Sequence, residues 1–502
     1  MVGEIRASME ASSGPRRSSG QEPDGTGDGA DRLSALPDDV LLLVLARLPC
    51  AAAAARTGVL SRRWRGLWAG LRQIVLRDVP FPSIEAALGA RGRVPPPPPA
   101  VSLLKIRVPQ RQRRGTKKHR ADSAGVNSLL RAAARLEPEN LEFRLPAGLI
   151  GRSRLAVDLP RFDGATSIAL DFASPFSLRV PAGAEFPALE ALSLTYTVTD
   201  LDALLSCCPR LRTLRLCRVL FADHKCDVRV NSPSLQELAV CRELSLTQRV
   251  DIIAPALKQL TMSFSTMELI STSFLAPLVE NVSWHCYYLG PYVAFGLWGI
   301  NKLRLQTADS QEQILSSLQI HAWADTSLLH VEAGDFAQEI EKHMVAAFSV
   351  LELHLTAKGH AFGVFVFHLL GMDRIRAATR RLKVVLERSA MKRGCQPFCP
   401  CEFPNWKSQI ISLSALEEVE FNGFEGKDHE FDLLKWILGC APVLKRMIVK
   451  LSHETSASND GCAKIYSIFK ACSSLECDVY DSSGEYIFGM HIISILLDKT
   501  EI

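Results

Sequence analysis

Three cysteines in the last quarter of the sequence are the residues whose type and spacing come closest to a metal site. Cys395, Cys399 and Cys401 are separated by three residues and then by one. Structural zinc sites usually take four ligands in pairs such as Cys-x2-Cys, and the sequence offers no convincing second pair. We therefore predict that these cysteines hold no metal, and we expect no other cofactor.

Motifs of catalysis are also missing from the sequence. It contains no His-Glu-x-x-His, no Gly-x-Ser-x-Gly and no Gly-Lys-Ser/Thr. The glycine run GTGDGA at residue 25 neither follows an expected strand nor opens a helix, so it is not a phosphate-binding loop. We predict that the protein is not an enzyme, with catalysis by residues far apart in the sequence as the alternative.

The stretch GVLSRRWRGLW, residues 58–68, combines tryptophan with arginine and could bind either nucleic acid or protein. On a helical wheel the apolar residues here follow one stripe: Leu60, Trp64, Leu67, Trp68 and Leu71. Arg62 and Arg65 fall on the opposite face. A nucleic-acid site needs rings and guanidinium groups on one face, so that bases stack while phosphates are neutralised. The pattern therefore favours a helix packed against protein, either the chain's own core or a partner.

The segment before this stretch predicts a helix with more apolar surface than one face needs. Pro37 can occupy the first helical position, and Asp38 and Asp39 complement the positive end of the helix dipole. One side of the helix carries Val40, Leu41, Val44, Leu45 and Leu48. Leu42 and Leu43 widen the apolar surface beyond that side, and an alanine-rich second helix follows. So small a helical unit rarely buries enough surface alone, so we expect a partner to cover the remainder.

Residues 31–75 resemble an F-box, in the variant common in plant proteins. The resemblance is carried by Leu36-Pro37, Leu48-Pro49, Ala55-Arg56-Thr57, Val59-Leu60-Ser61, Arg63-Trp64 and Leu67-Trp68. The F-box of that family docks on the Skp-type adaptor of SCF (Skp, cullin, F-box) ubiquitin ligases, and the resemblance implies the same partners here. It implies an adaptor-binding set of Leu36, Pro37, Val40, Leu41, Val44, Leu45, Leu48, Leu60 and Trp64.

The composition is that of a globular chain with room for several domains: 502 residues, of which 47% are hydrophobic and 22% charged. Residues 1–30 lack the apolar core of a secretory signal and predict a disordered tail. The longest apolar stretch, residues 41–55, is broken by Arg47 and Pro49 and is too short to span a bilayer, so no membrane partner is expected. We expect the 14 cysteines as free thiols in a reducing compartment, cytoplasmic and/or nuclear.

Positive charge is concentrated in one segment. The net charge is +4, and residues 105–120 hold eight Lys or Arg and no acid, which leaves 50 basic against 54 acidic residues elsewhere. The rest of the chain therefore lacks the excess of positive charge that is typical of a nucleic-acid-binding surface. Because five prolines, 95–99, precede the segment, we predict a Pro-rich and basic linker over residues 81–125. It could be a solvated loop, a phosphate-binding arm or a nuclear-import signal formed by Arg111, Arg113, Arg114, Lys117, Lys118 and Arg120.

Internal repeats dominate the remaining sequence. The form Pro-x-Leu-x-x-Leu-x-apolar, with Val in places, recurs with its proline at positions 187, 209, 233, 255 and 277, in steps of 22, 24, 22 and 22. This period predicts an α/β leucine-rich-repeat solenoid over residues 126–394, with parallel strands on one face and helices or turns on the other. Leu214, Leu238, Leu260 and Val282 should stack on successive strands, while Arg212 and Arg215 should face outward.

The C-terminal part has a second family resemblance. Residues 399–449 are similar to the FBD region that closes many plant F-box and leucine-rich-repeat proteins, through Trp406, Leu416-Glu417-Glu418-Val419, Gly423, Gly426 and Leu434-Lys435. We assign residues 395–475 to the FBD region and terminal repeats, and 476–502 to the C-terminal end. From the residues alone, this region is a pair of repeats joined by a glycine-bounded turn.

Two classes of function fit the sequence. In the first, the protein is the substrate-recruiting subunit of an SCF-type ubiquitin ligase, with an unknown target protein on the strand face of the repeats. In the second, it is a leucine-rich-repeat scaffold, nuclear or nucleic-acid-associated through residues 105–120. The surplus apolar surface at Leu42 and Leu43 favours the first class.

Overall fold

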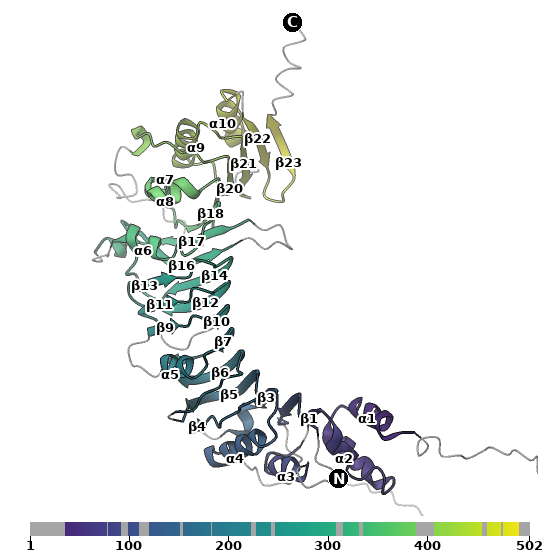
Figure 1. Ribbon diagram of the computed structural model, residues 1–502. Helices are drawn as coiled ribbons and strands as arrows, with labels where there is room; N and C mark the ends of the chain where they lie inside the picture. Colours follow the sequence, from purple (N-terminus) through teal and green to yellow (C-terminus); the bar gives the residue numbers. More distant parts are fainter. Residues whose placement is uncertain are drawn as a thin grey trace, which may run out of the picture.

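The computed structural model describes residues 36–77, 79–91, 99–109, 120–150, 154–181, 183–221, 227–241, 246–307, 315–330, 335–387, 406–453, 459–472 and 475–490. They form a small helical unit at the N-terminal end, followed by a curved solenoid of stacked strands (Figure 1). Strands line one face of the solenoid, and helices or a second small sheet line the other. The α/β solenoid predicted from the repeats is confirmed.

The elements have the following bounds. The helices are α1 (Asp38–Ala46), α2 (Ala51–Arg56), α3 (Phe81–Arg91), α4 (Ser123–Ala134), α5 (Leu201–Ser206), α6 (Phe336–Lys342), α7 (Gly363–Gly371), α8 (Asp373–Ala378), α9 (Asp428–Cys440) and α10 (Asn459–Lys470), with 3-10 turns η1 (Thr57–Val59), η2 (Leu67–Gly70), η3 (Ala147–Leu149), η4 (Thr326–His330) and η6 (Trp406–Ser408). The strands are β1 (Gln73–Arg77), β2 (Leu103–Arg107), β3 (Asn140–Leu145), β4 (Leu155–Asp158), β5 (Ser167–Arg179), β6 (Ala191–Thr199), β7 (Thr213–Cys217), β8 (Leu220–Phe221), β9 (Asp227–Asn231), β10 (Glu237–Cys241), β11 (Arg249–Ile253), β12 (Gln259–Thr266), β13 (Ser271–Leu275), β14 (Asn281–Tyr288), β15 (Ala294–Phe295), β16 (Trp298–Gln306), β17 (Ser317–Ala324), β18 (Val350–Thr356), β19 (Arg381–Leu386), β20 (Glu418–Phe424), β21 (Arg446–Leu451), β22 (Glu476–Tyr480) and β23 (Tyr486–Met490).

The strand face is one continuous sheet, with twenty strands among the described residues. Its main order is β1, β2, β3, β5, β6, β7, β10, β12, β14, β16, β17, β18, β19, β20, β21, β22 and β23. These neighbours are parallel except at β16, which runs antiparallel to both β14 and β17, and at the last pair, β22 and β23.

The N-terminal unit, residues 36–71, contains two helices, α1 and α2, followed by the 3-10 turns η1 and η2. A continuous third helix through Trp64 is a wrong prediction. Residues 62–66 form turns, and Gly66 takes a φ of 87°, which a right-handed helix cannot include. The side chain of Trp64 is nevertheless buried.

The linker expected over residues 81–125 is wrong for its described parts, because they begin the solenoid. α3 packs against α4, and β2 lies between β1 and β3 in parallel register. The basic charges obscured the alternation of apolar and polar residues in β2, which buries Leu104 and Ile106. Residues 92–98 and 110–119 lie outside the described residues.

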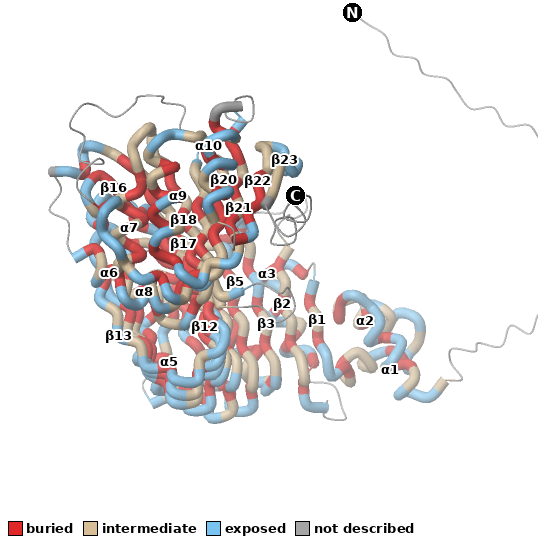
Figure 2. The backbone as a smooth tube through the Cα atoms, turned by 90° about the horizontal axis from the view of Figure 1, so that it is seen from above, coloured by how far each residue is buried: buried red, intermediate tan, exposed pale blue. Residues whose placement is uncertain are grey.

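Strand register follows the repeats. Leu214 on β7 pairs with Leu238 on β10, which pairs with Leu260 on β12, which pairs with Val282 on β14. All four side chains are buried, as predicted, and Arg212 and Arg215 are exposed. Figure 2 shows the buried residues inside the stacked strands and the exposed residues along the outer loops.

Longer steps between paired strands leave room for longer helices on the back of the sheet, whereas the 22-position step from Ala191 on β6 to Thr213 on β7 holds the six-residue α5. Glu237 on β10 pairs with Gln259 on β12, 22 positions later, and the described part of the return path holds β11 of a second sheet, formed by β9, β11 and β13. Arg446 on β21 pairs with Glu476 on β22, 30 positions later, and this path holds α10. A helix rises about 1.5 Å per residue against about 3.3 Å for a strand, so a helical return path needs more residues.

A buried polar chain ties α6 to β14. Trp284 Nε1 donates to His343 Nδ1 (2.8 Å), so the neutral ring carries its proton on Nε2, next to the Tyr288 hydroxyl (2.5 Å). That hydroxyl donates to Glu339 Oε1 (2.8 Å). Burial raises the pKa of Glu339, but its interactions with nearby His343, with Lys342 and with the Ile270 amide outweigh burial and lower the pKa to about 2.

The described part of the region that resembles an FBD contains η6, β20, α9 and β21. Gly423 takes a φ of 84°, and a Cβ there would lie 2.9 Å from the Leu386 carbonyl oxygen, so glycine is required at this bulge. In the first turn of α9, Glu430 Oε2 accepts the amides of Glu425 and Lys427, each at 3.0 Å. Burial raises the pKa of Glu430 to about 7, although these hydrogen bonds act in the opposite direction.

We predict that Leu214→Ala lowers the free energy of unfolding by about 2 to 5 kcal/mol, because it removes a buried side chain from the stack of repeats. Arg212→Ala, in the same repeat, is the matched control and should cost under about 0.5 kcal/mol, because Arg212 is exposed. Denaturant unfolding followed by circular dichroism measures both. Equally small losses would contradict the stacked core.

We predict that Glu430→Gln changes the pH dependence of stability. The folded-state pKa of about 7 lies above the ordinary 4.5, so the carboxyl stabilises the fold fully below pH 4.5 and loses that contribution as the pH rises through 7. The shift corresponds to roughly 3 kcal/mol. Unfolding midpoints of wild type and variant between pH 4 and 8 should diverge in the variant's favour as pH rises. Parallel profiles would contradict the raised pKa.

Candidate protein-interaction sites

The N-terminal helical unit has a small core separate from that of the solenoid. This core consists of Leu41, Leu45, Ala54, Trp64 and Leu71. Their exposed fractions run from 0% to 6%. Of the adaptor-binding set that the resemblance implies, Leu41, Leu45 and Trp64 therefore lie beneath the surface and position the residues above them. Leu36 and Val40 are half-buried, and Pro37 is exposed.

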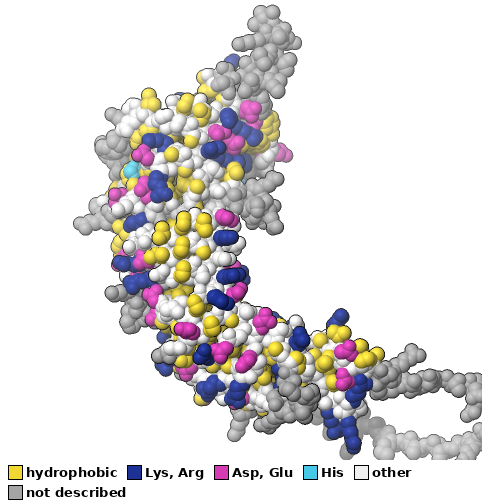
Figure 3. Space-filling view, in the orientation of Figure 1, with side chains coloured by type: hydrophobic (Ala, Val, Ile, Leu, Met, Phe, Trp, Pro, Cys, Tyr) yellow, Lys and Arg dark blue, Asp and Glu magenta, His cyan; other side chains and the backbone are white. Residues whose placement is uncertain are grey.

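Other apolar residues of the same unit are left in solvent. The exposed apolar set is Leu43, Val44, Leu48, Val59 and Leu60. The exposed fraction reaches 67% at Leu43 and 85% at Val59. Figure 3 shows hydrophobic side chains over the part of the unit that holds α1. The surplus of leucines in α1 pointed to Leu43, whereas Val59 lies in a 3-10 turn and follows no helical period.

One arginine of the unit has a structural role that the sequence did not reveal. Arg63 Nε donates to Asp38 Oδ1 (2.8 Å), and Arg63 Nη2 donates to the Leu36 carbonyl. These contacts tie the turn around Trp64 to the first residue of α1. Arg62 and Arg65 are exposed, as the helical wheel predicted.

The unit is joined to the first repeat by buried polar contacts. Arg91, at the end of α3, is 2% exposed, and its guanidinium donates to the carbonyls of Ala69 (2.9 Å), Leu71 (3.1 Å) and Pro99 (2.9 Å). Cys50 Sγ, before α2, lies 3.0 Å from the carbonyl oxygen of Arg77 in β1. The unit and the solenoid are therefore held in one relative orientation by contacts on two sides.

Outward residues on the strand face change character along the solenoid. Around β12 they are small and uncharged, with Ala239, Thr261 and Ser283 in one register row. Toward both ends, opposite charges pair across strands, as between β3 and β5 and between β21 and β22. Arg215 pairs with Glu237 (2.8 Å) at the border of the uncharged section. The strand face therefore offers a largely neutral middle section flanked by charge pairs.

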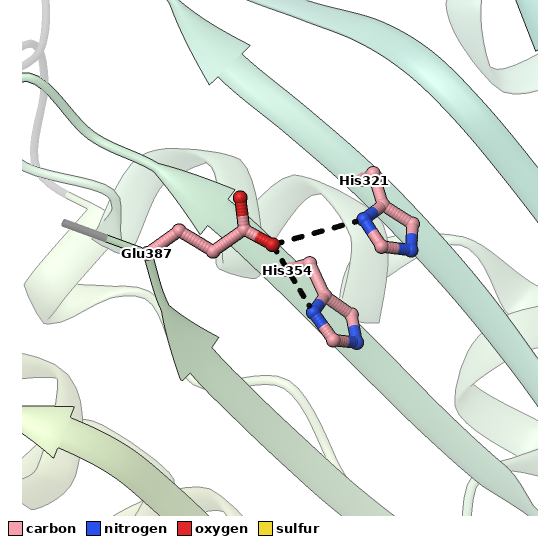
Figure 4. Close-up of side chains that lie close together, drawn as sticks. All are labelled: His321, His354 and Glu387. Atoms are coloured by element: carbon pink, nitrogen blue, oxygen red, sulfur yellow. Dashed lines mark ion pairs between the residues drawn. The ribbon is translucent and has the colours of Figure 1, made fainter. Parts of the chain in front are cut away.

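A histidine pair lies on the strand face where β17 and β18 meet. His321 and His354 are register partners, and their ring centroids are 4.2 Å apart. Glu387, directly after β19, places Oε1 at 3.4 Å from His354 Nδ1 and 3.9 Å from His321 Nδ1 (Figure 4). Burial, followed by the neighbouring His354 and Lys302, lowers the pKa of His321 to about 4, so its ring is neutral near pH 7. No motif or local spacing in the sequence predicts this cluster.

Several predicted site residues lie outside the described residues. These are Arg111, Arg113, Arg114, Lys117 and Lys118 of the expected import signal, and Cys395, Cys399 and Cys401. Arg120 is described and is exposed just before α4. Among the helices that the structure describes, none is both long and apolar enough to cross a membrane.

Family models match three parts of the chain. Residues 33–74 match the F-box domain. Residues 126–273 match the leucine-rich repeats of the FBD-associated F-box protein At5g56370, and residues 412–449 match the FBD.

Two proteins of Arabidopsis thaliana are similar to this chain. The putative F-box/FBD/LRR-repeat protein At1g66290 is 25% identical over 296 residues, which cover 56% of this chain and 58% of the relative. The F-box/LRR-repeat protein At3g03360 is 28% identical over 249 residues, 47% of this chain and 48% of the relative. The chain thus spans about half the length of the curated relatives it matches. Taken together, the matches identify an F-box domain, leucine-rich repeats and an FBD region in this chain, the combination carried by the F-box/FBD/LRR-repeat proteins that it resembles.

Proposed function

We propose that this protein recruits target proteins to an SCF-type ubiquitin ligase. In this role the F-box binds a Skp-type adaptor and, through it, a cullin, while the strand face of the repeats binds the target. The protein catalyses nothing itself, and it raises the effective concentration of target lysines near the ubiquitin-loaded enzyme.

The exposed apolar set of the F-box is the observation that carries this proposal. The unit already has its own core around Leu41, Leu45 and Trp64. Leu43, Val44 and the other exposed members add nothing to that core, and clustered exposed apolar residues mark protein interfaces. A partner that covers these residues would form an interface with the apolar centre that stable interfaces usually have. Within the adaptor-binding set, Val44, Leu48 and Leu60 are thus the proposed contacts, joined by Leu43 and Val59.

The strand face supports the second half of the proposal. Its outward residues take no part in the core, so they can vary without loss of the fold, as solenoid binding faces do. The neutral section around Thr261 and Ser283 can be desolvated at a lower cost than the paired charges beside it.

The alternative, a scaffold that uses residues 105–120 to reach nucleic acid or the nucleus, gains less support. Lys105 lies in β2 and forms an ion pair with Glu142, so part of the basic charge is neutralised within the sheet. The nuclear-import signal stays a prediction, carried by the residues from Arg111 to Arg120.

We predict that Leu43→Asp combined with Val44→Asp abolishes co-purification with a Skp-type adaptor. Both side chains are exposed, so thermal unfolding should change little, while the new charges would be desolvated in the interface. Arg62→Ala combined with Arg65→Ala is the matched control and should retain the adaptor. Leu41→Asp should also lose it, but with a lower melting temperature, because Leu41 is fully buried.

The adaptor-binding proposal fails if the chain with both aspartates still retains the adaptor. It also fails if residues 31–75 and the full chain both bind no Skp-type adaptor.

We predict that Thr261→Arg combined with Ser283→Arg stops target ubiquitination while adaptor binding persists. The two arginines would place like charges on paired positions of the neutral section. Ser206→Arg, at the exposed end of α5 on the opposite face, is the matched control. Proteomic measurement of ubiquitin remnants compares wild type, the F-box variant and both arginine variants. A protein whose ubiquitination depends on the F-box but ignores the strand face would contradict the assigned target surface.

A further inference from the structure

The sheet register brings three metal-ligating side chains together on the strand face. His321 and His354 are paired on β17 and β18, and the amide of Glu387 donates to the Leu355 carbonyl (2.9 Å), which continues the pairing with β18. One ligand atom of each of the three side chains lies within 4.8 Å of the other two. The backbone pairing therefore sets the spacing of the ligands.

Neighbouring residues orient His354 and Glu387 and leave one ligand atom of each facing the cluster. His354 Nε2 lies 3.0 Å from Glu352 Oε1, so the neutral ring carries its proton on Nε2 and presents the lone pair of Nδ1. Thr356 Oγ1 donates to Glu387 Oε2 (3.1 Å), which leaves Oε1 toward the histidines. A carboxylate behind a metal-ligating histidine is the usual device that fixes its tautomer. Here Glu352 provides that device.

The facing atoms are spaced for an ion between them. The two Nδ1 to Oε1 distances, 3.4 and 3.9 Å, exceed the roughly 2.7 to 3.2 Å of a hydrogen bond. Ligand atoms bonded at about 2.0 to 2.1 Å in a tetrahedral zinc site are about 3.3 Å apart. The rings of His321 and His354 are 13° from parallel, so each must turn about its Cβ–Cγ bond for the lone pairs to converge. Both rings border the open side of the sheet, which permits that turn.

We propose that His321 Nδ1, His354 Nδ1 and Glu387 Oε1 bind a divalent transition-metal ion of the zinc type. Two imidazoles and one carboxylate suit Zn²⁺, whereas Mg²⁺ and Ca²⁺ prefer all-oxygen sites. Glu352 and Glu387 supply negative charge that offsets the nearby Lys302 and Lys383. Three protein ligands leave the fourth position to water on the open side. The site does not depend on the function proposed above.

Metal titration of the full-length chain tests this site. Cys395, Cys399 and Cys401 are first replaced by Ser, because thiolates also bind zinc. After chelator treatment, Zn²⁺ is titrated by calorimetry and Co²⁺ by visible absorption, which reports tetrahedral coordination. We expect one saturable equivalent that excess Mg²⁺ does not displace. His354→Ala and Glu387→Gln should each weaken binding about tenfold or more. His285→Ala, on β14, which β16 separates from β17, is the matched control and should bind as before.

The Glu387→Gln variant keeps the test independent of folding. Glu387 is exposed, so this substitution removes the negative charge of one ligand without disturbing the core. Thermal unfolding of each variant is measured alongside. Absence of saturable Zn²⁺ binding to the chain that lacks Cys395, Cys399 and Cys401 would overturn the proposal. Equal affinity in the parent chain, His354→Ala and Glu387→Gln would overturn it as well, since the ion would then be bound elsewhere.

Discussion

Parallel, in-register pairing of strands one repeat apart is the constraint on which the rest of this structure depends. A strand that slipped by one residue would turn its leucines to solvent and its outward residues into the core. The register therefore keeps Leu214, Leu238 and Leu260 buried from strand to strand. It also aligns the outward residues in rows. The register that packs the core thus also arranges the surface available for recognition. The outward residues on that surface can change without changing the fold.

In the interior of the described sheet, this parallel order is broken at β16. Its antiparallel pairing places Arg304 opposite His285 and Lys302 opposite His321. Burial, followed by Arg304 and Lys302, lowers the pKa of His285 to about 4. Behind the same strands, the hydrogen-bonded chain from Trp284 through His343 and Tyr288 to Glu339 holds α6 in place. Three histidines whose pKa values are lowered, His285, His321 and His343, therefore lie beside or behind the strand that interrupts the parallel order.

Features with a local period could be predicted from the sequence, and features set by turns or by distant strands could not. The spacing of proline and leucine specified the repeats and their register. The apolar stripe through Trp64 has the spacing of a helix, but successive turns can also bury every third or fourth side chain. In β2, the outward Lys105 and Arg107 concealed a strand. His354 lies 33 positions after His321, and Glu387 lies 33 positions after His354, in repeats longer than the clear 22-residue copies. Only the register of the folded strands therefore reveals their cluster.

The contact between the F-box and the solenoid bears directly on the proposed role. A recruiting subunit must hold its adaptor and its target in a defined relative position, because ubiquitin transfer depends on proximity. A buried guanidinium is tolerated only where its donors remain satisfied, so the three carbonyls around Arg91 must stay in place. That requirement fixes η2 of the F-box against α3 and the first strands. In the proposed role, the direction in which a target is presented is then set by the curvature of the solenoid itself (Figure 1).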